Sequence, residues 1–387
     1  MGRRQAPVRD RRRSELTNFF RTGYRAAQGA FLLLSSTDRW RRPFILIRRV
    51  LTAPMTLRKI LNVPPVVASY LLSRLTRRPI VLGRPFMLML EPSSQCNLHC
   101  PLCAVGAGRL TRPQGHMPLK QFNRILDQMG PYLLHLTLWN QGEPFLNPHL
   151  IEMIRYAKAR KMTVLTSTNG HYLADGRMAD RLVRSGLDDL IISLDGISPR
   201  TYRGYRKGGD LGRVLSGIDT MVRTKKRLRS ARPFIELQFL IMKHNQHEIE
   251  PFRSLAKRLG VDRISLKTLQ VETVQEARQF LPRRRSYRRY RVENGSIRLK
   301  GKLGHHCRWI WFCPVINSDG TVCPCCFDKD NQVPLGKAFN AQSMDDIWHG
   351  RPYRNFRRRI LAGRDRIPLC QNCSEGLARL VVRKEAV

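Results

Sequence analysis

Residues 85–103 read PFMLMLEPSSQCNLHCPLC, an apolar strand-forming run followed by three cysteines. Cys96, Cys100 and Cys103 have the spacing C-x3-C-x2-C, and the chain has no further cysteine before Cys307. Three thiolates on a short loop can bind three irons of a 4Fe–4S cubane and leave the fourth iron open. A structural zinc site normally closes with four ligands, which this loop lacks. The stretch therefore predicts an iron–sulfur cluster with one free iron, directly after the first strand.

Strands and helices alternate from Pro85 onward. Strands are expected at 85–91, 132–140, 162–168, 189–195, 234–242 and 263–269, with helices at 119–129, 150–160, 178–185, 211–224 and 248–259 between them. Such repeats predict a parallel sheet with right-handed crossovers. The expected fold is α/β, a partial (β/α)6 TIM-like barrel or an open curved sheet. Side chains at the carboxyl ends of its strands should share one site.

The chain is strongly basic: 70 Lys and Arg face 29 Asp and Glu among 387 residues, for a formal net charge of +41. This excess implies anionic partners such as acidic lipid, nucleic acid or a phosphorylated or carboxylated substrate. The ten cysteines form short-spaced clusters. A disulfide framework suits small secreted domains, so metal or cluster binding is favoured. No secretory signal is convincing, and no run reaches the ~18 uninterrupted apolar residues of a membrane span.

The three-cysteine loop resembles the signature of the radical S-adenosylmethionine (radical SAM) superfamily, and later motifs extend the resemblance. QGEP (141–144) follows the second strand, STNG (167–170) the third, and SLDG (193–196) the fourth, with YRGYRKGG (202–209) after it. Each of these turn motifs alone is common, but with the cysteine loop they make four motifs in order at four strand ends, and that combination is specific. The resemblance implies a cluster on Cys96, Cys100 and Cys103. It also implies cofactor contacts from Gly142, Glu143, Pro144, Ser167, Asn169, Ser193, Asp195 and Arg206.

The resemblance also implies a reaction. The methionine amino and carboxylate groups of SAM bind the open iron, one electron breaks the sulfur–C5′ bond, and the resulting 5′-deoxyadenosyl radical removes hydrogen from a substrate. The electron requires a low-potential donor such as a flavodoxin or ferredoxin, so a cytoplasmic location is expected. Lys267 and Glu272, at and after the sixth strand, face the same mouth. A role as substrate base and a salt-bridged role are both open for them.

The tail holds the remaining cysteines. Its landmarks are Cys307, Gly320-x4-Cys325, Leu335-Gly336, Ile347-Trp348 and a closing Cys370-x2-Cys373. This pattern resembles the SPASM/twitch module found behind many radical SAM cores. The resemblance implies that Cys307, Cys325, Cys370 and Cys373 hold a second, fully ligated 4Fe–4S cluster for electron transfer, with a rubredoxin-like or zinc site as the alternative. Two-cluster modules carry further cysteines after the last pair, and this chain has none. Buried thiols are therefore expected at Cys313, Cys323 and Cys326, and a further cluster on them is disfavoured.

Four segments are expected: a basic helical extension (1–82), a radical SAM core (83–275), a charged connector (276–304) and a SPASM/twitch module (305–387). The extension alternates arginine clusters with apolar patches. This fits helices on an anionic membrane, or helices packed on the core with their arginines in solvent. The connector contains RRRSYRRYR (283–291), expected as a solvated loop, with a clamp for an acidic substrate or nucleic acid as the other interpretation.

These patterns together predict a radical SAM oxidoreductase or maturase acting on a peptide, a sugar-like molecule or a lipid-linked intermediate. A ribosomal-peptide maturase is the alternative within the superfamily, although the N-terminal segment lacks a clear winged-helix pattern. An alternative of another class is a non-catalytic basic protein with structural zinc that binds membrane or nucleic acid. That alternative leaves the isolated loop at Cys96–Cys103 unexplained, and nucleic acid is the least expected partner.

Overall fold

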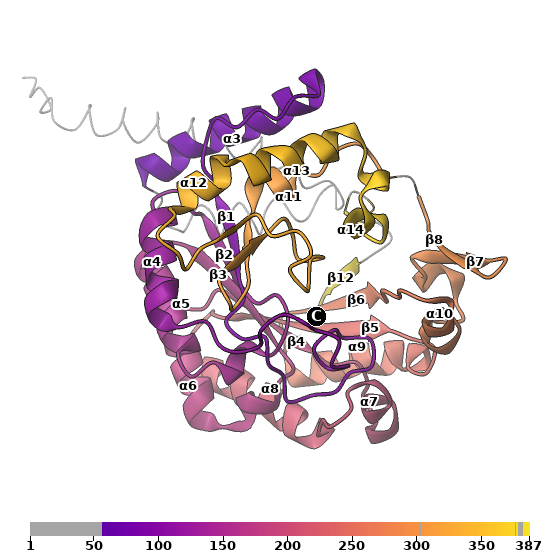
Figure 1. Cartoon of the computed structure of the whole chain (residues 1–387). Helices are drawn as coiled ribbons and strands as arrows, with labels where there is room; N and C mark the ends of the chain where they lie inside the picture. Colours follow the sequence, from indigo (N-terminus) through magenta and orange to yellow (C-terminus); the bar gives the residue numbers. More distant parts are fainter. Residues whose placement is uncertain (1–55, 302, 376, 378–381) are drawn as a thin grey trace, which may run out of the picture.

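The computed structural model describes residues 56–387 apart from residues 302, 376 and 378–381. Six parallel strands form its centre and neighbour one another in sequence order (Figure 1). They are β1 (Met87–Leu90), β2 (His135–Leu138), β3 (Thr163–Thr168), β4 (Asp189–Ser193), β5 (Phe234–Ile241) and β6 (Arg263–Thr268). The expected α/β fold with a six-stranded partial barrel is confirmed.

Helices connect these strands and cover the outside of the barrel (Figure 1). They are α4 (Leu119–Met129), α5 (Leu150–Ala159), α6 (Gly176–Arg184), α7 (Pro199–Tyr205), α8 (Leu211–Arg227) and α9 (Ile249–Leu259). Short 3₁₀ turns lie at Pro144–Leu146, His171–Ala174, Gln246–Glu248, Arg285–Tyr287 and Arg364–Arg366. The sequence analysis missed α7. A capping box between Ser198 and Thr201 and the proline at position 199 start this helix.

The two faces of the strands differ because side chains alternate along a strand. On β5, Ile235, Leu237 and Phe239 are fully buried in the hydrophobic core. Glu236, on the other face of β5, accepts hydrogen bonds from Arg263 of β6 (2.8 Å) and Lys384 (2.9 Å). The barrel interior therefore holds paired charges, and the outer face supplies the apolar core.

The C-terminal segment joins this sheet at both edges. β9 (Val315–Ile316) pairs parallel to β1, and β10 (Thr321–Cys323) and β11 (Gly336–Lys337) follow antiparallel. At the opposite edge, β12 (Val382–Ala386) pairs antiparallel to β6. The result is one ten-stranded sheet. The second cysteine module is thus built onto the core, a continuity that the sequence analysis did not anticipate.

The connector is more ordered than expected. It contains α10 (Val274–Phe280) and a hairpin of β7 (Tyr290–Glu293) and β8 (Ser296–Leu299). Tyr287, Arg289 and Tyr290 of the arginine-rich run are buried. The expectation of a solvated loop is wrong for these residues, because Arg289 bonds to Thr268 and Ser374 and Tyr290 bonds to Asn372.

The remaining helices extend from the β1 side of the barrel toward β12 (Figure 1). They are α11 (Trp309–Phe312), α12 (Met344–His349), α13 (Arg351–Ala362) and α14 (Pro368–Gln371), with the N-terminal α3 (Leu57–Thr76) beside them (Figure 1). Tyr70 of α3 contacts the rings of Trp311 and Phe312 at centroid distances of 5.9 and 5.4 Å. Buried Lys59 donates to the carbonyls of Arg160 (2.7 Å) and Lys161 (3.0 Å) after α5.

One face of α3 therefore packs on the core. Packing on the core was one of the two interpretations given for the N-terminal extension. Residues 1–55, the rest of that extension, lie outside the described residues. Among the helices that the structure describes, none is long and apolar enough to cross a membrane. The bounds of the four expected segments stay predictions.

Candidate functional site

The first cysteine loop leaves β1 and turns back at the carboxyl ends of the strands. Cys100 is buried, and Cys96 and Cys103 are half-buried. The loop is fastened to the segment after α7, because the His99 N–H donates to the Lys207 carbonyl (2.9 Å). Cys96 Sγ accepts from the Leu98 N–H at 3.4 Å. The loop therefore presents three thiols from a fixed backbone.

The thiol chemistry of this loop fits iron. Burial, together with smaller contributions from the charges on Glu143, Cys103 and Cys100, raises the pKa of Cys96 to about 11. Burial also raises the pKa of Cys100, against the pull of the Arg206 guanidinium. Clustered thiols of this kind resist ionisation by themselves, whereas a bound metal deprotonates a coordinating thiol outright. The loop is thus suited to a cluster that supplies the missing positive charge.

The QGEP turn packs directly beneath the cysteine loop. Gly142 has φ of +66°, and a Cβ atom there would lie 2.4 Å from the Ser93 carbonyl oxygen, so only glycine fits. The Glu143 N–H donates to the Gln95 carbonyl (2.7 Å), and Pro144 begins the following 3₁₀ turn. The close approach of the two backbones fixes the turn after β2 against the residue that precedes Cys96.

The Glu143 carboxylate is occupied by donors of its own chain. It accepts hydrogen bonds from the Asn169 N–H (2.7 Å), the Thr168 hydroxyl (2.8 Å) and the Phe145 N–H (3.1 Å). Burial raises its pKa to about 7. Glu143 therefore holds the STNG turn in place, while the direct cofactor contact that the sequence implied for it stays a prediction.

Asn169 carries this connection on to the cysteine loop. Its Nδ2 donates to Asn97 Oδ1 (2.7 Å) and lies 3.9 Å from Cys96 Sγ. Ser167 and Ser193 lie at the ends of β3 and β4, on the same edge. The sequence analysis missed Asn97, although its place between two ligand cysteines could have drawn attention to it.

Asp195 and Arg206 form a buried ion pair. Arg206 Nε and Nη2 lie 2.7 and 2.6 Å from Asp195 Oδ2, and the Asp195 side chain is fully buried. The other oxygen of Asp195 accepts the Leu240 N–H (2.8 Å). The guanidinium also lies beside the Cys100 thiol and lowers its pKa. The structure thus brings both residues to the site, and their contact with SAM stays a prediction.

A second buried ion pair escaped the sequence analysis. Arg112 Nη2 lies 2.7 Å from Glu91 Oε1, with both side chains almost fully buried. Glu91, directly after β1, also accepts the N–H groups of Gln141 (3.1 Å) and Ser318 (3.0 Å). One carboxylate therefore links the first strand, the QGEP turn and the C-terminal module. Gln141 and Ser318 lie far from Glu91 in the chain, so no local sequence pattern predicts the role of this carboxylate.

The four expected cysteines of the tail lie in one region of the structure, because their charges affect one another in pairs. The charge on Cys373 affects the pKa of both Cys307 and Cys325, and Cys307 affects that of Cys325. Cys370 and Cys373 interact likewise across one turn. Burial raises the pKa of Cys307 to about 12. The group of Cys307, Cys325, Cys370 and Cys373, which we call the second cysteine group, has the donor number and chemistry of a closed cluster.

The side chain of Arg364 independently indicates that the second cysteine group binds a negatively charged cluster. Its side chain is buried, and Nη1 donates to the carbonyls of His306 (3.1 Å) and Glu375 (3.0 Å). Its Nε and Nη2 are buried and have no hydrogen-bond partner in the described part of the chain. The guanidinium lies against the thiols of Cys370 and Cys373. Cluster sulfurs would give these orphaned donors their acceptors.

The other three cysteines divide. Cys313 and Cys323 are buried, and Cys323 donates to Asn331 Oδ1 at 3.2 Å. Cys326 is exposed, against expectation, and lies beside Cys325 and Cys373. Within the described residues no group of three or more His, Cys, Asp or Glu side chains is spaced to hold a single metal ion.

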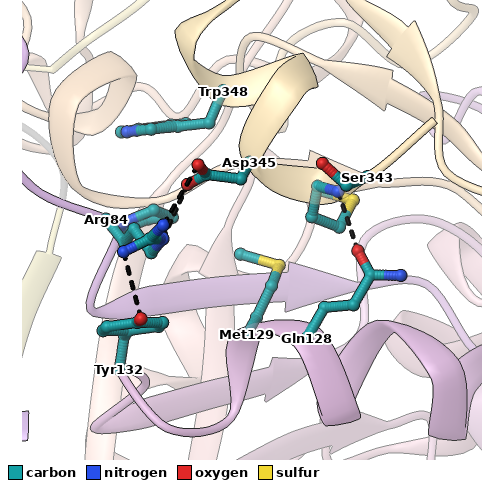
Figure 2. A pocket seen from close by; sticks show the side chains of 9 residues that line it. Arg84, Gln128, Met129, Tyr132, Ser343, Asp345 and Trp348 are labelled. Carbon is teal, nitrogen blue, oxygen red and sulfur yellow. Dashed lines mark hydrogen bonds and ion pairs between the residues drawn. The ribbon is translucent and has the colours of Figure 1, made fainter. Parts of the chain in front are cut away.

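Two hollows differ in kind. A cavity of about 250 Å³ lies at the joint between α4 and α12, where Arg84 bridges Asp345 (2.6 Å) and the Tyr132 hydroxyl (3.0 Å) (Figure 2). Its lining contains no cysteine, and its polar groups pair with one another. A cavity of about 200 Å³ instead lies at the carboxyl ends of β5 and β6 and includes Leu102 of the first cysteine loop. The second hollow is the candidate substrate site.

Comparisons with known proteins agree with this arrangement. Residues 90–235 match the radical SAM superfamily, and residues 307–374 match the SPASM iron–sulfur cluster-binding domain. The chain is 25% identical over 329 residues to the tungsten-containing aldehyde ferredoxin oxidoreductase cofactor-modifying protein of Pyrococcus furiosus, covering 74% of this chain and 86% of that protein.

Two further relatives match over shorter stretches. The AdoMet-dependent heme synthase of Methanosarcina barkeri is 28% identical over 177 residues, 46% of this chain and 48% of that protein. The mycofactocin maturase MftC of Mycobacterium ulcerans is 27% identical over 181 residues, 46% of each chain. The chain therefore spans about half the length of these two relatives.

Solved structures share the fold. Streptococcus suis SuiB bound to its precursor peptide SuiA superposes with a TM-score of 0.55 at 18% identity, covering 95% of this chain and 84% of that one. Native anSMEcpe with bound AdoMet and Cp18Cys peptide gives a TM-score of 0.54 at 17% identity, covering 75% and 88%. The chain therefore carries a radical SAM domain at residues 90–235 and, at residues 307–374, a SPASM domain for an auxiliary iron–sulfur cluster.

Proposed function

We propose that this enzyme uses a radical generated from SAM to remove hydrogen from a substrate held between its two cysteine groups. One observation carries the proposal: a single cavity has in its lining residues that lie next to each group. Leu102 of the first cysteine loop lines it, and so does Arg289, which reaches Ser374 beside Cys373 (3.4 Å). A substrate there would meet the radical from one side and an electron acceptor from the other.

The bound clusters and SAM supply the bond cleavage and the electrons. The protein's own part is placement. Cys96, Cys100 and Cys103 would hold the first cluster, and Asn169, tied to Asn97, would fix the loop that carries them. Gly142, Ser167 and Ser193 line the edge where SAM would lie. The Asp195–Arg206 pair keeps a positive charge beside Cys100.

Cys307, Cys325, Cys370 and Cys373 would hold the auxiliary cluster, which is suited to accept or relay an electron because protein ligands close it. This supports oxidation of the substrate radical. The reduction of the first cluster calls for a flavodoxin- or ferredoxin-like donor, and we place the reaction on the cytoplasmic side for that reason. Peptide maturation is the second candidate, because one relative, MftC, is a maturase.

Anaerobic reconstitution tests the proposal. The wild type should bind about eight irons and release 5′-deoxyadenosine from SAM after reduction by dithionite. Cys96→Ala should abolish 5′-deoxyadenosine release. Cys307→Ala should lose about four irons and keep that release. Cys323→Ser is the matched control, since Cys323 lies outside both groups and should keep all the iron. A fully loaded wild type that leaves SAM intact would refute the proposal.

We also propose that α3 contacts an anionic membrane surface. Six of the seven strongly exposed large hydrophobic side chains in the described residues lie between Leu57 and Leu82. Those of α3 (Leu57, Leu61, Leu71, Leu72 and Leu75) occupy one face by helical periodicity. Exposed arginines, Arg74, Arg77 and Arg78, follow at the end of the helix. An apolar stripe with a basic flank is the pattern of an interfacial helix.

Vesicle flotation with phosphatidylserine liposomes tests this contact. A variant with Leu61, Leu72 and Leu75 replaced by glutamine should stay at the bottom of the gradient while the wild type floats. These leucines are exposed, so the substitution spares the packed face of α3. Equal flotation of the two proteins would contradict the contact.

A further inference from the structure

The cavity at the ends of β5 and β6 has an apolar wall and a charged wall. Leu102, Tyr205, Leu240 and Leu269 form the first. Four cations and two carboxylates contribute to the second: Arg109, Lys267, Arg289, Lys329, Glu272 and Glu276. The balance of charge in this small space decides what it can hold.

Both carboxylates are already paired at the rim. Arg109 lies 3.1 Å from Glu276. Lys329 lies 3.6 Å from Glu272. The charges within each of these two ion pairs cancel. The charge of the cavity is therefore set by the two inner cations, Lys267 and Arg289.

Neither inner cation has a carboxylate partner among the described residues. Within the part of the chain that the structure describes, buried Arg289 donates to neutral groups: the hydroxyl of Thr268 (3.2 Å), the carbonyl of Thr268 and the hydroxyl of Ser374 (3.4 Å). The ammonium group of Lys267 makes no hydrogen bond or ion pair in the part of the chain that the structure describes. Burial lowers the pKa of both side chains.

The charged groups that face Lys267 do not neutralise it. Glu236 lies on its attractive side, but Arg263 and Lys384 already pair with that carboxylate. Asp195 is likewise committed to Arg206. Lys384 and Arg289 repel Lys267. Arg289 is buried and Lys267 is half-buried. A charge removed from water is costly unless it is paired, so these two cations favour a negative partner that the described lining does not supply.

We propose that this cavity binds an anionic group of the substrate, a carboxylate or a phosphate, through the ammonium group of Lys267 with the guanidinium of Arg289 behind it. The proposal rests on the proposed function, because it assigns a substrate class to the same site. Some 200 Å³ is room for one such group and a few further atoms. The apolar wall, with Leu102, would hold the remaining part of the substrate toward the first cysteine loop.

Equilibrium dialysis of the reconstituted, SAM-saturated enzyme tests the site, with labelled inorganic phosphate and labelled succinate as separate probes. The wild type should bind at least one of them saturably. Lys267→Met should weaken that binding about tenfold or more, as the loss of a charged hydrogen bond does, and Lys267→Arg should retain it. Lys257→Met removes the same charge from the exposed surface of α9 and should bind as the wild type does. This control accounts for unspecific attraction to a chain of net charge +41.

Several outcomes would overturn the site. Equal binding by the wild type and Lys267→Met, with iron content showing that the variant is folded, removes it. If that variant shifts the potential of the auxiliary cluster and leaves anion binding unchanged, the inner cations only offset the charge of the second cysteine group. Should Lys267→Met fail to fold, Lys267→Gln replaces it. The assay needs no turnover, so a missing 5′-deoxyadenosine signal would reject the proposed function while the anion site stands.

Discussion

Replacing Glu143 by glutamine probes the contact between the second and third motifs. In the wild type both carboxylate oxygens accept hydrogen bonds from the protein, Oε2 from the Asn169 N–H (2.7 Å) and Oε1 from the Thr168 hydroxyl (2.8 Å) and the Phe145 N–H (3.1 Å). Glutamine keeps the shape but turns one oxygen into an NH2 donor. At least one buried backbone N–H must then lose its acceptor.

The cost follows from that loss. At a pH well above 7 the Glu143 carboxylate is ionised, and a hydrogen bond to a charged acceptor contributes about 1.5–3 kcal/mol, so we expect Glu143→Gln to destabilise the protein without SAM by about 2 kcal/mol under these conditions. Because Asn169 also holds Asn97 of the cysteine loop, the competent arrangement becomes less populated. SAM affinity should fall by up to about thirtyfold as a result.

Two measurements on the reconstituted enzyme check this expectation. Denaturation midpoints report the stability without SAM, and dialysis with labelled SAM reports the affinity. Glu293→Gln, the same change on the exposed surface of the β7–β8 hairpin, should alter neither. If Glu143→Gln weakened SAM binding and left the stability untouched, the carboxylate would contact SAM itself and the positioning role would be wrong. Unchanged values in both measurements would refute the reasoning altogether.

Three further predictions concern buried cations. Arg364→Leu should lower the reduction potential of the auxiliary cluster, because it removes hydrogen bonds and a positive charge that favour the reduced state. An EPR-monitored redox titration measures this potential, and Arg366→Leu on the surface should leave it unchanged. Arg112→Met should lower the stability by about 3–5 kcal/mol, because it leaves the buried carboxylate of Glu91 unpaired. In a background that already carries Glu91→Gln the same substitution should cost less, and denaturation midpoints of the two single variants and the double variant measure the difference. Burial lowers the pKa of Lys59 to about 8 from 10.5, so the folded chain binds fewer protons than the unfolded chain between these values. Stability should therefore rise by up to about 3 kcal/mol from pH 8 to 10.5, and the pH series of Lys59→Met should lack this rise.

The core elements could be read from the sequence because their signals are local. α4 begins and ends at the expected residues, Leu119 and Met129, and each of the six core strands falls within its expected range. The connector could not be read this way. Its arginines indicated a solvated loop, but Tyr287 and Tyr290 pack inward and draw Arg289 with them. Charge density along a sequence does not show which side chains a hairpin will cover.

The sequence by itself determined the chemistry: three thiols before a long gap, four motifs at successive strand ends, and four more thiols in the tail. Ligand type and spacing are properties of short segments, so they need no fold to be recognised. Only the tertiary structure decided how these parts work together. It placed β9 on β1 and gave Glu91 a partner in Ser318. Among the described residues it also left two donors of Arg364 without acceptors and Lys267 without a carboxylate of its own. Such features depend on burial and on partners distant in the chain, because desolvation makes an unpaired charge costly only after the chain has folded around it.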